Sequence, residues 1–225
     1  SNGPVTPRTG MTVEVNALWY NAVKASLKWA ARKEDKAFVS IWSDMPDMIE
    51  HAFIENFWDN EQGYPADVVN GEQKDFSVRP NMVIAAAMDH SMLTPEMKNS
   101  MLKVVERELL TPRGLRTLSP RDPEYTGHYR GNQEERDLAY HQGTAWPWML
   151  EHFVKAYLDV HKQSGLSLVK RIFFGFEEEM VQHGIGSISE VYDGDPPHQP
   201  GGAISQAWSV AALLRISEMI DEFSS

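Results

Sequence analysis

The helical spacing of apolar residues is the feature that most constrains the fold of this 225-residue chain. From residue 13, in V-E-V-N-A-L-W-Y-N-A-V-K, apolar side chains recur every three to four positions, which is the period of a helix face and not the alternation of a strand. The same spacing predicts seven helical segments, at about 12–33, 36–58, 82–88, 94–110, 143–163, 166–182 and 203–223. No segment requires a sheet beyond short β-hairpins in the loops, so the sequence predicts an all-α fold of antiparallel helices.

Local signals indicate where several of these helices begin or break. Pro46 should bend or interrupt the segment 36–58, because proline disrupts a helix interior. Thr94 is a good N-cap with Pro95 at the first helical position. Thr144 is expected to cap the helix of 143–163, with Pro147 in its first turn.

Two long polar segments, residues 111–142 and 184–202, separate the later helices. They are rich in proline, glycine and charge. Loops of this length in compact domains are usually functional or disordered. Alternating short and long connections should bring the long loops together at one end of the helical array, where a site can form.

Composition excludes several classes of partner and of site. The length and the 42% hydrophobic content fit one globular domain over residues 1–225, and the net charge of −11 works against binding to nucleic acid or to an anionic membrane. The chain has no cysteine, which excludes disulfides and thiolate metal sites and fits the reducing cytoplasm. The histidines fall singly, so we expect no metal and no cofactor, although D-G-D at 193–195 leaves a calcium ion open.

The remaining chemistry is that of carboxylates, amides and aromatic rings on loops. The chain has no glycine-rich phosphate cradle, no G-x-S-x-G motif and no cysteine nucleophile. In carbohydrate sites, by contrast, two carboxyl groups act as acid and base, and aromatic rings stack on sugars.

The stretch A-Y-H-Q-G-T-A-W-P-W, at 139–148, has two compatible interpretations. Trp146 and Trp148 can anchor the core at the start of a helix. His141 and Gln142, the last loop residues, can at the same time point into a cavity beside a tryptophan.

Two further groups have a structural and a functional interpretation. Glu190 lies between apolar Ile188 and Val191, so it is either part of a solvated acidic loop or a buried carboxylate with a shifted pKa. Arg79 and Asn81 precede a helix and can simply cap it, while an arginine there can also form paired hydrogen bonds with sugar hydroxyls.

Five stretches together resemble the C-terminal part of bacterial glycogen debranching enzymes, the amylo-α-1,6-glucosidase domain. They occur in the family's order from residue 6 to about 215, and the combination is highly specific. The stretches are T-P-R-T-G-M-T-V-E-V-N-A-L-W-Y-N-A at 6–22, R-P-N at 79–81, G-L-R-T-L-S-P-R-D-P-E-Y at 114–125, Y-H-Q-G-T-A-W-P-W at 140–148, and S-E-V-Y-D-G-D with A-I-S-Q-A-W-S-V at 189–210.

The resemblance implies an (α/α)6 barrel of the glucoamylase-like type, with twelve helices in two rings. Seven helices are too few for that barrel, so we expect the chain to be the C-terminal portion of a catalytic domain. Such a portion leaves an apolar flank, from which we expect self-association or marginal stability.

The resemblance also implies inverting hydrolysis of α-1,6-linked glucose at the branch points of glycogen or of a branched α-glucan oligosaccharide. Glu190 matches the family's general base. The general acid belongs to a T-W-M-D stretch that this sequence lacks, so we expect it upstream of Ser1 and expect little hydrolysis by residues 1–225 alone. The resemblance assigns substrate contact to His141, Gln142, Trp146 and Trp148, and less directly to Arg79, Asn81, Asp137 and Glu14.

Two other functions stay open. The chain can belong to another inverting (α/α)6 glycoside hydrolase, trehalase-like or glucoamylase-like, because the barrel and the pair of carboxylates are shared and specificity lies in the loops. It can also be a carbohydrate-binding unit without catalysis.

Overall fold

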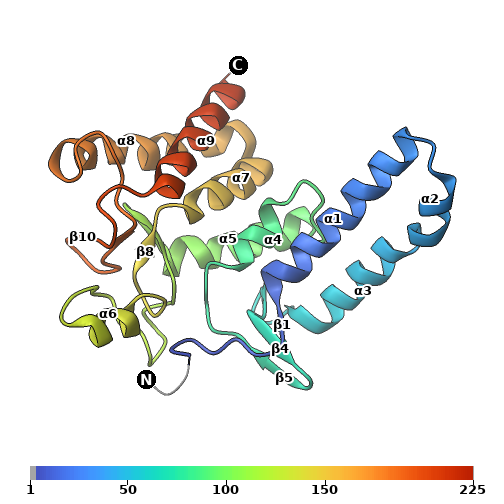
Figure 1. The fold of residues 1–225 in the computed structure, drawn as a ribbon, viewed down its shortest axis with the longest axis horizontal. Coiled ribbons are helices and arrows are strands. Elements are labelled where there is room, and N and C mark those ends of the chain that lie inside the picture. Colours follow the sequence, from blue (N-terminus) through green and yellow to red (C-terminus); the bar gives the residue numbers. More distant parts are fainter. Residues whose placement is uncertain (1–3, 225) are drawn as a thin grey trace. The chain divides into compact units, whose positions relative to one another are not determined.

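The computed structural model describes residues 4–224 and is mostly helical (Figure 1). All seven predicted helical segments are present, so the helical fold class is confirmed. The α-helices of the described residues are α1 (Val13–Arg32), α2 (Lys36–Trp42), α3 (Met45–Phe57), α4 (Met82–Ala87), α5 (Pro95–Glu108), α6 (Gln133–Ala139), α7 (Met149–His161), α8 (Leu166–Gln182) and α9 (Ala207–Ser224), and a 3-10 turn, η1 (Lys162–Gly165), joins α7 to α8. Among residues 4–224, no helix is long and apolar enough to span a membrane.

The expected breaks and caps of the N-terminal helices are confirmed. The predicted segment 36–58 is interrupted after Trp42, and Pro46 lies in the first turn of α3, where its missing N–H costs no helical hydrogen bond. The Thr94 hydroxyl accepts a hydrogen bond from the Met97 amide at 3.3 Å, and α5 begins at Pro95.

The start of α7 differs from the prediction. This helix begins at Met149, six residues later than expected, because Ala145–Trp146 forms strand β8. The prediction of Thr144 as a helix cap was therefore wrong: its hydroxyl is buried and donates to the Tyr140 carbonyl at 2.6 Å. Pro147 precedes the N-cap position of α7, which is occupied by Trp148.

Short strands form a five-stranded antiparallel sheet in the order β10-β9-β8-β7-β6. Their bounds are β6 (Leu110–Thr111), β7 (Gly114–Arg116), β8 (Ala145–Trp146), β9 (Val191–Tyr192) and β10 (Pro200–Gly201). The expectation of local hairpins alone was wrong, since Ala145 of β8 pairs with Tyr192 of β9 across more than forty residues. This pairing brings the two long loops together, as their alternation with short connections predicted.

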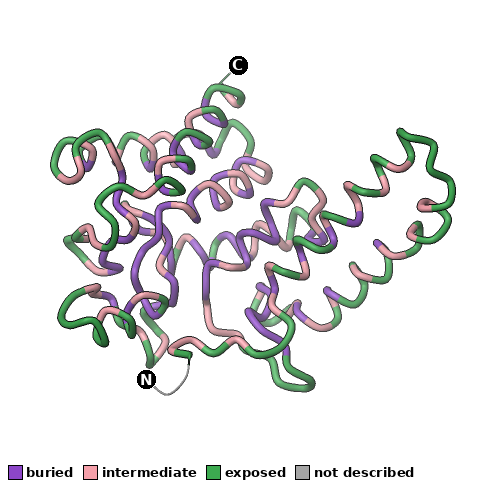
Figure 2. Tube along the Cα trace, in the orientation of Figure 1, coloured by how far each residue is buried: buried purple, intermediate pink, exposed green. Residues whose placement is uncertain are grey.

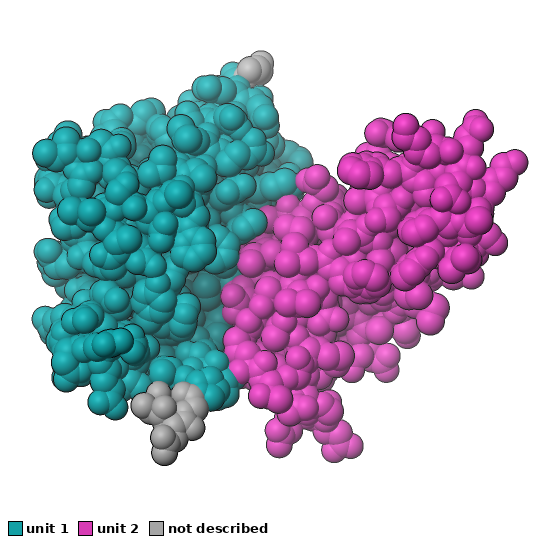
Figure 3. Space-filling model, in the orientation of Figure 1, with its two compact units in different colours: residues 1–7, 77–80, 102–225 teal, residues 8–76, 81–101 magenta. Residues whose placement is uncertain are grey.

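The chain divides into two compact units, each with its own core (Figures 2 and 3). Unit 1 comprises residues 1–7, 77–80 and 102–225, and unit 2 comprises residues 8–76 and 81–101. The organisation as a single domain over 1–225 stays a prediction.

The core of unit 1 follows from helical spacing. Buried Val169, Ile172 and Phe176 lie on one face of α8, and α9 packs against α7 and α8. Full burial of a leucine or phenylalanine side chain contributes about 1.5–3 kcal/mol. The largest fully buried side chains of this unit include Leu102, Leu109, Leu115, Leu118, Met149, Leu150, Phe153, Leu158, Phe176 and Tyr192.

Unit 2 combines helices with two small antiparallel sheets. Strand β4 (Val68–Asn70) pairs with β1 (Met11–Thr12) and β5 (Gln73–Asp75), and β2 (Trp58–Asp59) pairs with β3 (Tyr64–Pro65). Helix α4 is buried on all sides, which fits its uninterrupted apolar sequence M-V-I-A-A-A.

Candidate functional site

Glu190 lies directly before β9, and its carboxylate is held on both oxygens. Its amide donates to the Ala203 carbonyl at 2.9 Å, which ties residue 190 to the segment after β10. Its Oε2 accepts a hydrogen bond from the Ala203 amide at 2.8 Å, and its Oε1 accepts one from the Tyr140 hydroxyl. The half-buried carboxylate is therefore oriented by two neutral donors, a tyrosine hydroxyl that follows α6 and a backbone amide.

Tyr140 is a residue of this site that sequence reasoning missed. It ends α6 and lies among rings, with centroids 4.8 Å from both His141 and Trp146 and 5.7 Å from Tyr129. Burial and the hydrogen bond to Glu190 raise the pKa of the Tyr140 phenol, so its hydroxyl remains a donor at neutral pH. Its signal in the sequence was its place beside His141, but its partner is fifty residues away.

His141 is exposed, and its ring stacks on Trp146 with centroids 5.5 Å apart at 10°. Partial desolvation among these rings, and secondly the charge of Arg79, lower the pKa of the imidazole below its ordinary value. A neutral imidazole has one N–H donor and one acceptor nitrogen, which suits hydrogen bonding to sugar hydroxyls.

Gln142 and Arg79 are buried and bonded to each other. The Arg79 Nη2 donates to the Gln142 Oε1 at 2.7 Å, and its Nη1 donates to the carbonyls of His141 and Thr117 at 2.8 and 3.1 Å. The Gln142 Nε2 donates to the Glu124 carboxylate at 3.0 Å. The two side chains thus support the loop that carries His141. They also connect the predicted site residues to Glu124, an exposed carboxylate that was not predicted.

The tryptophans divide between core and surface. Trp146 is 4% exposed, and its indole N–H donates to the Thr144 hydroxyl and the Tyr140 carbonyl at 3.1 and 3.2 Å. Trp148 stacks on Trp208 with centroids 5.5 Å apart at 20°, and Trp208 is 44% exposed. Trp208, which sequence reasoning did not select, is thus the most accessible of these rings.

The two carboxylates of the D-G-D stretch, Asp193 and Asp195, form hydrogen bonds with other residues of the chain. One Asp193 oxygen accepts the Tyr129 amide at 2.7 Å, and the other lies 3.0 Å from His128 Nδ1. Asp195 accepts the Tyr125 hydroxyl at 2.8 Å. These contacts tie the loop 184–202 to the loop 111–142 beside Glu190.

Two predicted residues, Glu14 and Asn81, meet in unit 2 through Arg8 and Asp67. The Arg8 guanidinium donates to both Glu14 oxygens at 2.6 and 2.7 Å and to the Asp67 carboxylate at 2.7 and 3.1 Å. Asn81 donates from Nδ2 to Asp67 at 2.8 Å and makes no side-chain capping bond to α4. The cluster joins Arg8 to Asn81 within that unit.

Asp137 is an exposed residue of α6, and within residues 4–224 no hydrogen bond or ion pair joins it to Glu190. It lines a shallow depression with Val5, Gln133, Glu134 and Leu138.

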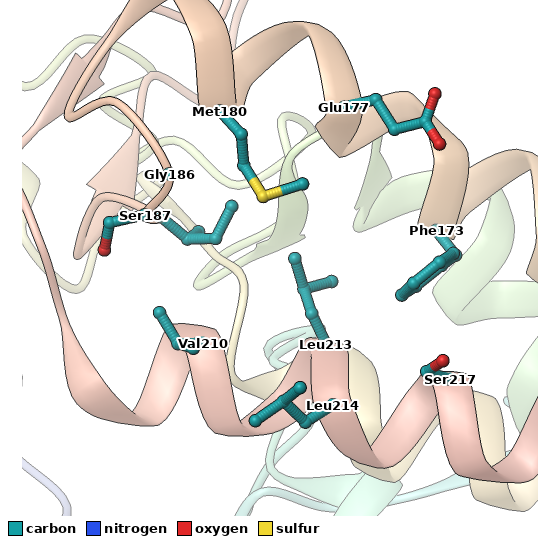
Figure 4. A pocket seen from close by; sticks show the side chains of 10 residues that line it. Phe173, Glu177, Met180, Gly186, Ser187, Val210, Leu213, Leu214 and Ser217 are labelled. Atoms are coloured by element: carbon teal, nitrogen blue, oxygen red, sulfur yellow. The ribbon is translucent and has the colours of Figure 1, made fainter.

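An apolar cavity of about 330 Å³ lies between α8 and α9 (Figure 4). Met180 of α8 and Leu213 of α9 extend toward each other across it. Its lining is mainly apolar and lacks the converging polar groups by which a sugar site fixes hydroxyls. The candidate site is therefore the corner around Glu190, Tyr140 and His141.

A sequence model of the amylo-alpha-1,6-glucosidase family matches residues 1–215. The glycogen debranching enzyme of Saccharomyces cerevisiae is 21% identical in an alignment that covers 94% of this chain and 17% of that enzyme. The chain thus spans less than a fifth of that curated relative.

Two solved structures share the fold at about 15% identity. Neutral trehalase Nth1 from Saccharomyces cerevisiae superposes with a TM-score of 0.67 over 94% of this chain and 40% of its own. A mannosylglycerate hydrolase from Thermus thermophilus superposes with a TM-score of 0.64 over 92% of this chain and 46% of its own. The fold thus matches part of the (α/α)6 barrel of such hydrolases, as predicted.

Proposed function

Because the chain belongs to the amylo-alpha-1,6-glucosidase family of glycoside hydrolase domains, we propose that it forms part of a catalytic domain that releases α-1,6-linked glucose at glycogen branch points with inversion. The observation that carries this proposal is the orientation of the Glu190 carboxylate by the Tyr140 hydroxyl and the Ala203 amide. A branched α-glucan is the proposed partner, and the cytoplasm is the proposed compartment.

Glu190 acts as the general base. Each carboxylate oxygen accepts one protein hydrogen bond and keeps a second lone-pair position for water. Glu190 takes a proton from that water, the water oxygen bonds to C1 from the face opposite the leaving group, and the C1–O6 bond breaks. A general acid protonates O6 as this bond breaks.

Sugar contact is proposed for the accessible groups next to Glu190. His141 offers a neutral imidazole, and Trp148 with exposed Trp208 offers an aromatic surface. An indirect role is proposed for three buried residues, which support the loop that carries His141 and Tyr140. They are Gln142, Arg79 and Trp146. Roles for Asp137, Glu14 and Asn81 stay proposals, the latter two through the cluster around Arg8.

A second candidate is another inverting (α/α)6 glycosidase, which the likeness to a trehalase favours. Comparing glucose release by the full-length protein from a singly branched dextrin, a linear α-1,4 chain and trehalose distinguishes the two. The debranching proposal predicts a clear preference for the branched substrate, and equal rates on the linear chain contradict it.

Glu190→Gln in the full-length protein tests the role of the carboxylate. The amide keeps the shape of the side chain but cannot take a proton, so we expect turnover to fall about a thousandfold or more while oligosaccharide binding is retained. The matched control is Glu134→Gln, since Glu134 is an exposed glutamate on α6. The control should keep both turnover and oligosaccharide binding. If Glu190→Gln also keeps its turnover, Glu190 is not the base; if neither the variants nor the unchanged protein hydrolyses the substrate but all bind it, the chain is a carbohydrate-binding unit.

A further inference from the structure

We propose that Tyr140 is a positioning residue for catalysis, whose hydroxyl fixes the carboxylate of Glu190 in the orientation that a base requires. This inference rests on the proposed function of Glu190 and assigns a role to a residue that the sequence did not single out. It is carried by three observations: the hydrogen bond itself, the contacts that support Tyr140, and the crowding on the other side of the carboxylate.

The hydrogen bond completes a two-point attachment. The Tyr140 hydroxyl donates to Oε1 of Glu190, and the Ala203 amide donates to Oε2 at 2.8 Å. One donor alone lets a carboxylate turn about its terminal bond, whereas two donors on different oxygens fix its plane. The plane determines the direction in which the free lone pairs meet the attacking water.

Tyr140 is itself held in place. Its amide donates to the Arg136 carbonyl at 3.0 Å, and its carbonyl accepts the Thr144 hydroxyl at 2.6 Å. Its ring contacts the rings of Tyr129 and Trp146, and α6 begins with a capping box of Asn132 and Glu135. A donor on such a support reaches Glu190 from one fixed point.

Gly202 packs closely against the Glu190 side chain, next to the Ala203 amide that binds Oε2. Its φ is +68°, and a Cβ built there overlaps the Glu190 Oε2 and lies 3.0 Å from the Glu190 Cβ. Glycine is therefore the residue that lets the backbone approach this close. Because a methyl group at this position overlaps Oε2 and its nearest neighbours are all atoms of Glu190, we expect Gly202→Ala to shift the carboxylate relative to the tyrosine hydroxyl.

The test is Tyr140→Phe in the full-length protein, with hydrolysis of a singly branched dextrin as the assay. We expect kcat to fall about tenfold to a hundredfold with KM changed less than about threefold, because the lost bond acts on the base and not on the sugar. Tyr129→Phe is the matched control, since it removes the hydroxyl of the neighbouring tyrosine. It should leave both constants within about twofold.

The double variant Tyr140→Phe with Glu190→Gln separates positioning from a general structural effect. If Tyr140 acts through Glu190, the double variant is no slower than Glu190→Gln alone. Gly202→Ala is a second single variant, to be used if Tyr140→Phe folds poorly. It should lower kcat with little change in KM.

The outcomes separate this inference from the proposed function. Turnover retained by Glu190→Gln overturns the base assignment, whatever Tyr140 does. Loss of turnover in Glu190→Gln with wild-type kcat in Tyr140→Phe or Gly202→Ala overturns the positioning role alone. A further loss in the double variant also overturns it.

Discussion

The guanidinium of Arg79 donates to the side-chain oxygen of Gln142 at 2.7 Å, and both residues are buried. A second nitrogen of the same guanidinium donates to the His141 and Thr117 carbonyls. Four residues of three separate segments therefore meet on one planar group, and this arrangement fixes the loop from which His141 emerges.

Arg79→Lys should destabilise unit 1. An ammonium group cannot reproduce the planar fork, so at least one buried acceptor loses its donor, at a cost of about 1–3 kcal/mol. Calorimetry of the full-length protein should show a lower unfolding temperature for this variant. Arg121→Lys is the control because its side chain is 73% exposed and its ion pair with Glu108 is 3.6 Å long, and an equal shift for both variants would contradict the bracing role.

His141 should titrate below its ordinary range, because partial desolvation and, secondly, the charge of Arg79 lower its pKa. A base whose pKa is lower when folded binds fewer protons in the folded state, so stability is lost as pH falls below about 6.5. His152 contributes with the same sign through burial. An NMR titration of the His141 ring should give a midpoint below about 6.5, and a midpoint at or above that ordinary value would refute the stated cause.

Trp208→Ala should weaken substrate binding more than chemistry. The exposed ring and its stacked partner Trp148 form the accessible aromatic surface of the site. Removing it should raise KM about fivefold or more with a smaller effect on kcat. Trp29→Ala, at a 70% exposed tryptophan of α1, serves as the control, and equal KM values for both variants would exclude Trp208 from the substrate surface.

The 225-residue chain by itself should self-associate through the apolar cavity between α8 and α9. Leu214 lines this cavity and is 63% exposed, next to Phe173 and Met180. Sedimentation analysis should show a larger species that dissociates in Leu214→Asp. Ile41→Asp, at a 74% exposed isoleucine of α2, should change nothing, and a monomeric wild-type chain would contradict the expected self-association.

The helices could be predicted because their signals are local. Spacing every three to four residues placed all seven segments, and Thr94 with Pro95 fixed the start of α5. Helix α6 was missed inside a loop, although Asn132 and Glu135 form the N-x-x-E pattern of a capping box, which a local reading could have found.

The sheet and the contacts of the site could not be predicted in the same way. Ala145 pairs with Tyr192, and Tyr140 bonds Glu190, across separations at which period and propensity carry no information. Glu190 itself was selected by resemblance. The hydrogen bond between Gln142 and Arg79 could not be predicted, because it joins residues that are far apart in the sequence and meet only in the folded chain. Residue identity therefore suggested the chemistry, and only tertiary structure indicated which groups face solvent and which brace the loop.

The central claim is that Glu190 activates water for attack with inversion, and Glu190→Ala in the full-length protein tests it most directly. With α-glucosyl fluoride and added azide, the azide nitrogen can bond to C1 from the side of the missing carboxylate while the C1–F bond breaks and fluoride departs. The account predicts that azide restores turnover and that the product is β-glucosyl azide, identified by NMR. Formation of the α-azide, or wild-type turnover by the variant without azide, would contradict it.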